Sequence, residues 1–416
     1  MKERAGESPV WEDALEQLRG LEELHLLRET KRASNPAGPA IVRNGQTLWN
    51  FSSNNYLDLA THPHVLKKAQ EALEKWGTGA GGSRLITGTL EIHEELEWRL
   101  SRLKKTETAL VFSSGYLANI GVIQALSRTA DGTRVPILFD KHVHASLIDA
   151  ILLSGSPWKS FPHNDIEAAR RIGESLLQGK APQSGQGKRQ PRILIVTEGV
   201  FSMDGDVAPL DELYKLTEQW EGLLIVDDAH GTGVVGFGGS GAASIMGVAG
   251  APRLVQVGTL SKALASQGGF VACANIVRDL LVNRARAFIF DTALAPPCVG
   301  AALGALDVLE NDPDRLAVLA ANVQLLRDAL RSRGFEIPES PSAIIPVMVH
   351  DSRRALRLAE ELEKKGYLVV AIRPPTVPPQ TDRLRITVMA THPQSVLASF
   401  AEALGSLHAG DLQSDF

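Results

Sequence analysis

The chain has 416 residues, 44% of them hydrophobic, and a formal net charge of −5, values typical of a globular protein with about two or three compact units. The charge gives no general attraction to nucleic acid or anionic membranes, no apolar run is long enough to span a bilayer, and the acidic N-terminus lacks a signal peptide's apolar core. Two cysteines, Cys273 and Cys298, cannot make a disulfide framework or a four-ligand zinc site, so we expect a soluble, cytoplasmic protein.

The first part of the chain, residues 1–48, is predicted to be a helical arm. A stripe of leucines predicts an amphipathic helix over residues 11–32, and a break rich in proline and glycine follows at residues 35–39. Residues 51–59 are polar and rich in turn formers. Residues 63–76, which begin with a proline, are predicted to form the next helix.

Residues 77–82, GTGAGG, match the G-x-G-x-x-G pattern of dinucleotide-binding sites. That pattern normally follows a strand, whereas here it follows a predicted helix. We therefore favour a tight loop near a ligand or a subunit contact over a nicotinamide site. Residues 89–105 are then predicted to form a helix that buries Leu96, Leu100 and Leu103.

From Thr108 onward, short apolar runs alternate with helical patterns. Strands are predicted over residues 108–112, 135–139, 158–161, 193–197, 223–226 and 254–257, and helices over 115–127, 144–154, 164–178 and 209–220. This alternation predicts an α/β domain, residues 49–297, built on a doubly wound and mostly parallel sheet. The polar residues 179–191 are predicted to form a solvated surface loop.

A smaller α+β unit is predicted over residues 298–416, after the pair Pro296–Pro297. Its expected elements are a helix over 299–331 that is broken near Pro313, a strand over 343–349, a helix over 352–365, strands over 367–372 and 384–388, and a closing helix over 393–407. The residues Arg373–Thr376 follow one of these strands. No internal repeat is visible.

Lys262 stands in an unusual setting. The run Arg253–Phe270, RLVQVGTLSKALASQGGF, carries an apolar strand, then the lysine, then small residues and glycines. Partial burial would lower the pKa of this lysine and raise its fraction of free amine, which Schiff-base chemistry requires. The alternative is a lysine whose ammonium reaches solvent from an ordinary strand–helix turn.

Other polar side chains are predicted to gather near this lysine, because ligands of open parallel sheets bind beyond the carboxyl ends of the strands. The polar segments at these ends are Ser113–Tyr116, Asp140–His144, Glu198–Asp206 and Asp227–His230. The HxH and DDxH runs within them would suit a divalent metal, and the Ser/Gly helix start could simply be a cap.

An organic cofactor is the competing reading of the same segments. The Ser/Gly helix start would bind a phosphate, and His144 would stack on a ring whose nitrogen Asp227 would bind. With Lys262 bonded covalently, these are the parts of a pyridoxal 5′-phosphate (PLP) site. We prefer the cofactor, because a metal leaves the lysine without a role.

The same segments resemble one known family, the α-oxoamine synthases. The matching motifs are NYLDL (55–59), GTGAGGSRLITGT (77–89), SSGYLAN (113–119), DKHVHASLIDA (140–150), TEGVFSMDGD (197–206), VDDAHGTGVVG (226–236), GTLSKALASQGG (258–269) and AIRPPTVPPQTDRLRIT (371–387). The resemblance runs from about Arg28 to beyond His392. It implies a fold-type-I, PLP-dependent, homodimeric enzyme that joins an amino acid to an acyl thioester with loss of CO2.

The resemblance also assigns roles residue by residue. Lys262 would be the Schiff-base lysine, His144 would stack on the pyridine ring and Asp227 would bind its nitrogen. The other expected cofactor-binding residues are Gly115, Tyr116, Ser202, His230, Thr259 and, from a neighbouring subunit, Thr292. Substrate would contact Arg28, His144, Thr376 and Arg385, the last of which would hold the amino-acid carboxylate.

Two residues depart from the family pattern. Asp58 stands where the family usually has glycine, and Asp291 stands where serine or threonine usually precedes the phosphate-binding Thr292. An acid beside that threonine would repel a phosphate, so we expect Asp291 to point away or to find a cation.

Residues 371–387 resemble in particular the family member that joins L-alanine to a pimeloyl thioester, carried by CoA or by acyl carrier protein, in biotin synthesis. The first alternative is the member that uses glycine and acetyl-CoA. A non-catalytic partner subunit of the same fold is a second alternative, although such a subunit could dispense with Lys262. No metal, nucleic acid or membrane is expected to bind.

Overall fold

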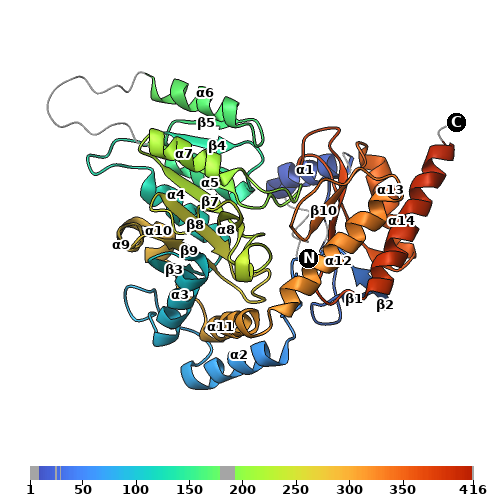
Figure 1. Ribbon diagram of the computed structural model, residues 1–416, viewed down its shortest axis with the longest axis horizontal. Coiled ribbons are helices and arrows are strands. Elements are labelled where there is room, and N and C mark those ends of the chain that lie inside the picture. The colour runs from blue at the N-terminus through green and yellow to red at the C-terminus, as the bar shows by residue number, and fades with distance from the viewer. Residues whose placement is uncertain (1–8, 24–25, 29, 179–192, 415–416) are drawn as a thin grey trace.

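The computed structural model describes residues 9–23, 26–28, 30–178 and 193–414 (Figure 1). The larger lobe contains the main sheet and the smaller lobe contains the C-terminal elements, with helices α2 (Pro63–Trp76) and α11 (Pro296–Asn311) packed together along one edge. The predicted surface loop at 179–191 lies outside the described residues. No helix in the described ranges is both long and apolar enough to cross a membrane.

The larger lobe is built on a seven-stranded sheet within the described residues, in the order β3-β9-β8-β7-β6-β4-β5. Its strands are β3 (Thr108–Phe112), β4 (Ile137–Asp140), β5 (Trp158–Phe161), β6 (Leu194–Glu198), β7 (Leu223–Asp227), β8 (Leu254–Thr259) and β9 (Gly269–Cys273). Strands β8, β7, β6, β4 and β5 pair in parallel. The predicted α/β class and mostly parallel sheet are therefore confirmed.

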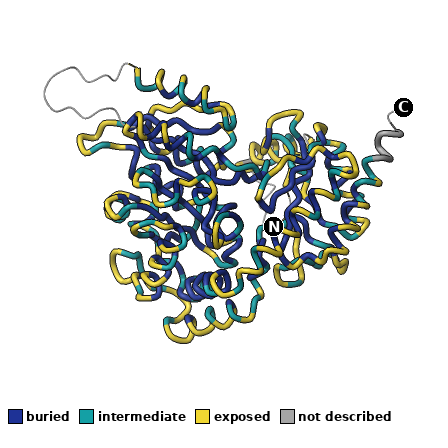
Figure 2. The backbone as a smooth tube through the Cα atoms, in the orientation of Figure 1, coloured by how far each residue is buried: buried dark blue, intermediate teal, exposed yellow. Residues whose placement is uncertain are grey.

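Helices surround this sheet on both faces, and the strands between them are mostly buried, except for the edge strand β5 (Figure 2). They are α3 (Glu91–Lys104), α4 (Gly115–Leu126), α5 (Ala145–Ser154), α6 (Ile166–Leu177), α7 (Leu210–Gln219), α8 (Ala242–Ile245), α9 (Asn275–Arg284) and α10 (Arg286–Ile289). The predicted helices correspond to α3 to α7, with small differences at their ends. The short α8, α9 and α10 were not predicted.

Strand β9 was also not predicted, and it runs antiparallel between β3 and β8. It begins at Gly269, where an added Cβ atom would lie 2.4 Å from the backbone nitrogen of Gly115. Glycine is therefore needed for the strand to pass this close to the first turn of α4. Because glycine weakens a strand, the run that begins with Gly268 and Gly269 gives no clear strand signal.

The N-terminal helix is shorter than predicted. It covers Glu12–Glu23 (α1), preceded by a short 3₁₀ turn over Pro9–Trp11, and residues 26–28 and 30–32 are not helical. The amides of Leu26 and Leu27 both donate to the carbonyl of Leu21, at 2.7 and 3.2 Å, which turns the chain out of the helix. The prediction of a helix over 11–32 is therefore wrong for residues 26–28 and 30–32.

The smaller lobe carries α12 (Asp314–Arg331), β10 (Ile344–Met348), α13 (Ser352–Lys364), β11 (Tyr367–Leu368), β12 (Val370–Ile372), β13 (Arg383–Thr387) and α14 (Gln394–Ser414). Helices α11 and α12 confirm the break near Pro313. The pair Pro296–Pro297 was predicted to precede the helix, but it forms the first turn of α11. Proline is tolerated there, because an amide in the first turn has no hydrogen-bond partner within its own helix.

The predicted strand 367–372 is divided between two sheets. Strand β12 pairs with β13, whereas β11 pairs with β2 (Gln46–Asn50), which forms a hairpin with β1 (Ala40–Arg43). The predicted domain boundary at 48/49 falls within β2, and the one at 297/298 falls within α11. The domain limits stay a prediction.

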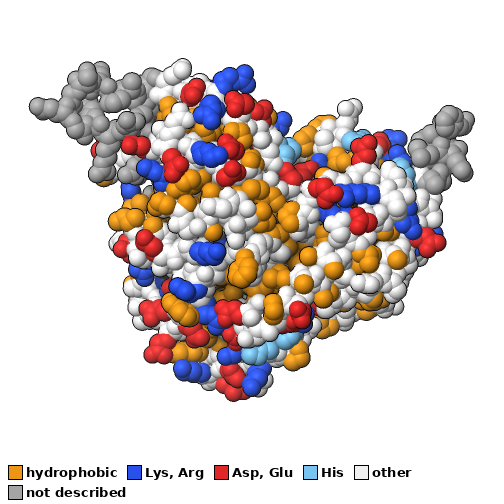
Figure 3. Space-filling model, viewed as in Figure 1, with side chains coloured by type: hydrophobic (Ala, Val, Ile, Leu, Met, Phe, Trp, Pro, Cys, Tyr) orange, Lys and Arg blue, Asp and Glu red, His pale blue; other side chains and the backbone are white. Residues whose placement is uncertain are grey.

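On the face drawn in Figure 3, acidic and basic side chains are interspersed.

Candidate active site

Four neighbouring parallel strands bring their carboxyl ends to one edge of the main sheet. Strands β4, β6, β7 and β8 end at Asp140, Glu198, Asp227 and Thr259. Glu198 and Asp227 are directly opposite in register, so their carboxyl groups face the same end of the sheet. The tertiary structure thus brings together the polar segments that the sequence placed after separate strands.

Lys262 lies in the turn after β8 and is partly buried. Its Nζ is 2.7 Å from Nε2 of His230. Burial lowers the pKa of Lys262 to about 8, and although Asp227 and Glu198 oppose this shift, Arg385 adds to it. A substantial fraction of this lysine is therefore the free amine near neutral pH, unlike a lysine in solvent.

Asp227 is buried and held by two donors. Its Oδ2 accepts from the side-chain amide of Asn119 at 2.7 Å, and its Oδ1 accepts from the Ala229 amide at 3.1 Å. The opposite Glu198 has a pKa well above its usual range, because burial and then the charge of Asp227 disfavour its ionised form. The Asp227 carboxylate is thus held in place at this edge of the sheet by its two donors.

His144 forms the N-cap of α5, where its Nδ1 accepts from the Ser146 amide at 3.2 Å. The side chain is solvent-exposed, yet partial enclosure by the surrounding chain lowers its pKa, against the opposing charge of Asp227. Its ring is therefore neutral at physiological pH and accessible for stacking.

The first turn of α4 forms a cradle beside β8. The Ser114 hydroxyl accepts from the Leu117 amide at 3.1 Å, so the predicted cap exists. The first-turn amides of Gly115 and Tyr116 have no carbonyl in their own helix to bond. An added Cβ at Gly115 would lie 3.3 Å from that of Thr259, so glycine lets the helix start approach the strand end.

Arg385 reaches this site from the smaller lobe. It is buried on β13, its Nε donates to the Ser202 carbonyl and its Nη2 donates to Oδ1 of Asn54 at 3.3 Å. Two residues earlier on the same face of the strand, Arg383 pairs with Asp204. The guanidinium thus joins the loop after β6 to the segment after β2.

Two predicted substrate residues lie farther out. Thr376 is exposed and lines a cavity of about 520 Å³ between the lobes, together with His142, Asp204 and Arg383. Arg28 is exposed on the non-helical stretch after α1 and does not line this cavity.

The two departures from the family pattern have local explanations. Asp58 has φ of 53°, in the left-handed region that favours glycine, and its carboxylate accepts from Asn55 and Thr391 at 3.1 and 2.8 Å. Asp291 accepts from the Ser113 hydroxyl, so its partner is a neutral donor and not the expected cation. Thr292 is exposed, and its backbone bridges to Ser83.

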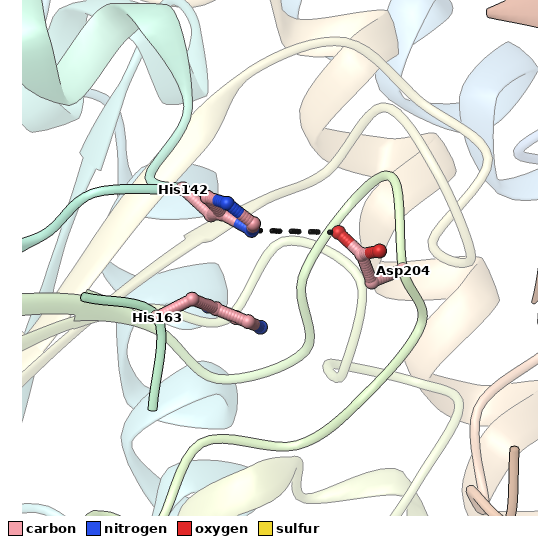
Figure 4. A group of neighbouring side chains, drawn as sticks. All are labelled: His142, His163 and Asp204. Atoms are coloured by element: carbon pink, nitrogen blue, oxygen red, sulfur yellow. Dashed lines mark ion pairs between the residues drawn. The ribbon is translucent and has the colours of Figure 1, made fainter. Parts of the chain in front are cut away.

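The residues that suggested a metal are separated by their partners. Asp228 turns away from Asp227 and pairs with the buried Lys104 at 2.6 Å. His142, His163 and Asp204 do place ligand atoms within 4.8 Å of one another (Figure 4). However, His163 contacts Asp140 and Asp206 through its two ring nitrogens, at 3.1 and 2.9 Å.

Although burial opposes it, these carboxylates raise the pKa of His163 to about 10. The protonated ring can donate to both carboxylates, so His163 forms part of an ion-pair network. The GTGAGG segment follows α2, as predicted, and therefore lacks the strand that a nicotinamide site needs.

Several residues of this site were not predicted. Asn119 lies one helical turn after Gly115, so its place beside the cofactor-binding residues could have been inferred from the helix period. Tyr56 and Glu198 stood within quoted motifs but received no role. The contact of Tyr56 with His230 had no local signal in the sequence.

Comparison with known proteins gives the same picture. The model of the aminotransferase class I and II family matches residues 46–404. A putative 8-amino-7-oxononanoate synthase from Desulforudis audaxviator is 47% identical over 91% of this chain and 94% of that protein. The 8-amino-7-oxononanoate synthase from Geobacter sulfurreducens is 44% identical over 94% of this chain and 96% of that protein.

Solved structures extend the likeness to the fold. A serine palmitoyltransferase from S. paucimobilis, described with a bound PLP–myriocin aldimine, has a TM-score of 0.84 and 28% identity, covering 96% of this chain and 98% of that chain. The predicted fold-type-I architecture is therefore confirmed.

Proposed function

The chain belongs to the aminotransferase class I and II family and, within it, to the 8-amino-7-oxononanoate synthases, which are PLP-dependent acyltransferases, and on this premise we propose that it condenses L-alanine with a pimeloyl thioester. In this reaction the Cα atom of alanine forms a bond to the thioester carbonyl carbon, the C–S bond breaks and the alanine carboxyl group leaves as CO2. The products are 8-amino-7-oxononanoate and the free thiol carrier, CoA or acyl carrier protein.

The observation that carries this proposal is the placement of a low-pKa lysine, one fixed carboxylate and one buried arginine around a single site. Lys262, Asp227 and Arg385 come from different strands or lobes, yet all three interact electrostatically across it. The donor set fits PLP. The α4 cradle offers amides to a phosphate, Asp227 offers a charge to a ring nitrogen, and Lys262 offers an amine to an aldehyde.

When bound, PLP would act as an electron sink for the bonds at Cα. Asp227, held by Asn119 and Ala229, would keep a proton on the ring nitrogen. His144 would pack on the ring from the start of α5. The Lys262 amine, once free, would accept the proton from Cα as general base.

Arg385 would hold the alanine carboxylate through its planar fork, since arginine can donate two parallel hydrogen bonds. Arg385→Lys keeps the charge but loses the fork, so the KM for L-alanine should rise about tenfold or more, and the KM for the thioester should change far less. Steady-state kinetics with each substrate varied in turn would measure both. Arg278, which is half-buried on α9 and paired with Asp279, is changed to lysine as the matched control; equal rises in both KM values would contradict this role.

The proposed substrates are tested directly by offering the purified chain L-alanine or glycine with pimeloyl-CoA, pimeloyl carrier protein or acetyl-CoA. We expect CO2 release and 8-amino-7-oxononanoate formation to be fastest with L-alanine and a pimeloyl thioester. If glycine with acetyl-CoA is the better pair, the biotin-pathway assignment is wrong. The two pimeloyl carriers, compared side by side, identify the acyl donor.

A second copy of the chain is part of the proposal. Thr292 is exposed here and would reach the phosphate of the partner copy, as the family resemblance implies. The complete site would then form only in a homodimer.

A further inference from the structure

An unbroken hydrogen-bonded chain leads from Lys262 into the protein core. The Nζ of Lys262 is 2.7 Å from Nε2 of His230, and Nδ1 of the same ring is 2.7 Å from the Tyr56 hydroxyl. That hydroxyl is also 3.1 Å from Oδ1 of Asn54. Tyr56 is fully buried, so its hydroxyl does not reach bulk water, and the guanidinium of Arg385 also interacts with it.

The ring of His230 allows the hydrogen bonds in this chain to reverse their direction. Burial, aided by Lys262 and Arg385, holds the pKa of His230 well below its usual range, so the ring is neutral. A neutral imidazole has one N–H donor and one acceptor nitrogen, and its neighbours decide which nitrogen carries the proton.

Both protonation states of Lys262 can therefore be satisfied. When the lysine is an ammonium, Nζ donates to Nε2, Nδ1–H donates to the Tyr56 oxygen, and the hydroxyl proton goes to Asn54. When the lysine is an amine, the hydroxyl donates to Nδ1, and Nε2–H donates to Nζ. The two arrangements differ by the one proton that Lys262 gains or loses.

We propose that Tyr56 is a positioning residue for Lys262, and that its hydroxyl turns between Asn54 and His230 as the lysine gains or loses a proton. Only one consequence rests on the proposed function: a lysine that acts as a base needs both its ammonium form and its amine form to be stable. The hydrogen-bond exchange itself is a property of the chain.

The charges around Lys262 act separately from this exchange. Asp227 and Glu198 favour the ammonium, whereas Arg385 disfavours it. His144 also faces this group. Arg385 reaches the far end of the hydrogen-bonded chain as well, because its Nη2 donates to Asn54. A purely structural Tyr56 would pack in the core without responding to the lysine.

Removing the hydroxyl is expected to weaken the ammonium state more than the amine state. In Tyr56→Phe the ammonium arrangement loses two bonds and leaves a buried N–H donor, whereas the amine arrangement loses one bond. The pKa of Lys262 should then fall by about half to one unit. It can be measured in the full chain freed of cofactor, from the pH dependence of trace acetylation at Lys262, quantified by peptide mass spectrometry.

The matched control is Tyr367→Phe, which also removes one tyrosine hydroxyl bond, to Ser399 at 2.9 Å, but on β11. This control should leave the pKa of Lys262 unchanged. If Tyr56→Phe lowers only the melting temperature and leaves that pKa unchanged, the proposal is overturned.

A second measurement does not depend on the stability of Tyr56→Phe. The chain has 4 tyrosines, so 3-fluorotyrosine labelling gives a small set of ¹⁹F signals, and phenylalanine substitutions at 116, 214 and 367 identify the Tyr56 signal by elimination. We expect this signal to move with pH at the midpoint of Lys262 and to stay constant in Lys262→Ala. A Tyr56 signal that ignores the titration of Lys262 in the wild type would refute the exchange, whatever the substrates prove to be.

Discussion

Replacing Lys262 with alanine is expected to lower turnover at least ~10⁴-fold, because the change removes both the covalent anchor and the proposed base. Its Nζ contacts His230 at the edge of the sheet, where burial brings its pKa to about 8. Steady-state assays with L-alanine and a pimeloyl thioester measure the loss. The protein should still fold, since the lysine lies in a turn and not in the core.

Borohydride reduction of the wild type provides the companion measurement. The cofactor should become fixed to the peptide that contains Lys262. Lys215, exposed on α7 and paired with Glu212, is the matched control, and its alanine variant should behave as the wild type. A label on another lysine, or a purified wild type without bound PLP, would remove Lys262 from its role and favour a non-catalytic partner subunit.

Asp227→Asn is expected to lower the rate at least ~10³-fold while leaving the fold intact. The substitution removes the charge that would hold a proton on the cofactor ring. It also disturbs local bonding, because Asp227 accepts from both Asn119 and Ala229 and an asparagine carries only one acceptor oxygen. Rate measurements at saturating cofactor separate lost chemistry from lost binding.

Asp211→Asn, the same substitution at a half-buried position on α7, serves as control and should keep the wild-type rate. Circular dichroism of both variants checks the fold. If Asp227→Asn turned over at nearly the wild-type rate, the partner of the ring nitrogen would have to be another residue. Glu198 would then be the first to test, because it lies opposite in register.

Much of the main sheet could be predicted because its signals are local. The apolar runs at 108–112 and 158–161 became β3 and β5 without change, and Pro63 began α2 as expected. Lys262 and Asp227 could be placed at strand ends because the carboxyl ends of parallel strands meet at one edge. Their functional roles were inferred because several spaced motifs resemble one family. A single motif would not have been specific enough to assign these roles.

The sequence by itself therefore determined most of the strands and helices of the main sheet and the residue types at the strand ends, since periodicity and turn residues are local to a few neighbouring positions. Only the tertiary structure decided which distant groups meet. Tyr56 and His230 are 174 residues apart, and Asp227 and Asp228 turn to different partners, Asn119 and Lys104. The antiparallel β9 and the divided strand 367–372 were decided in the same way, because their pairing partners lie far away in the chain. Such contacts depend on packing across the whole domain, which local propensity does not encode.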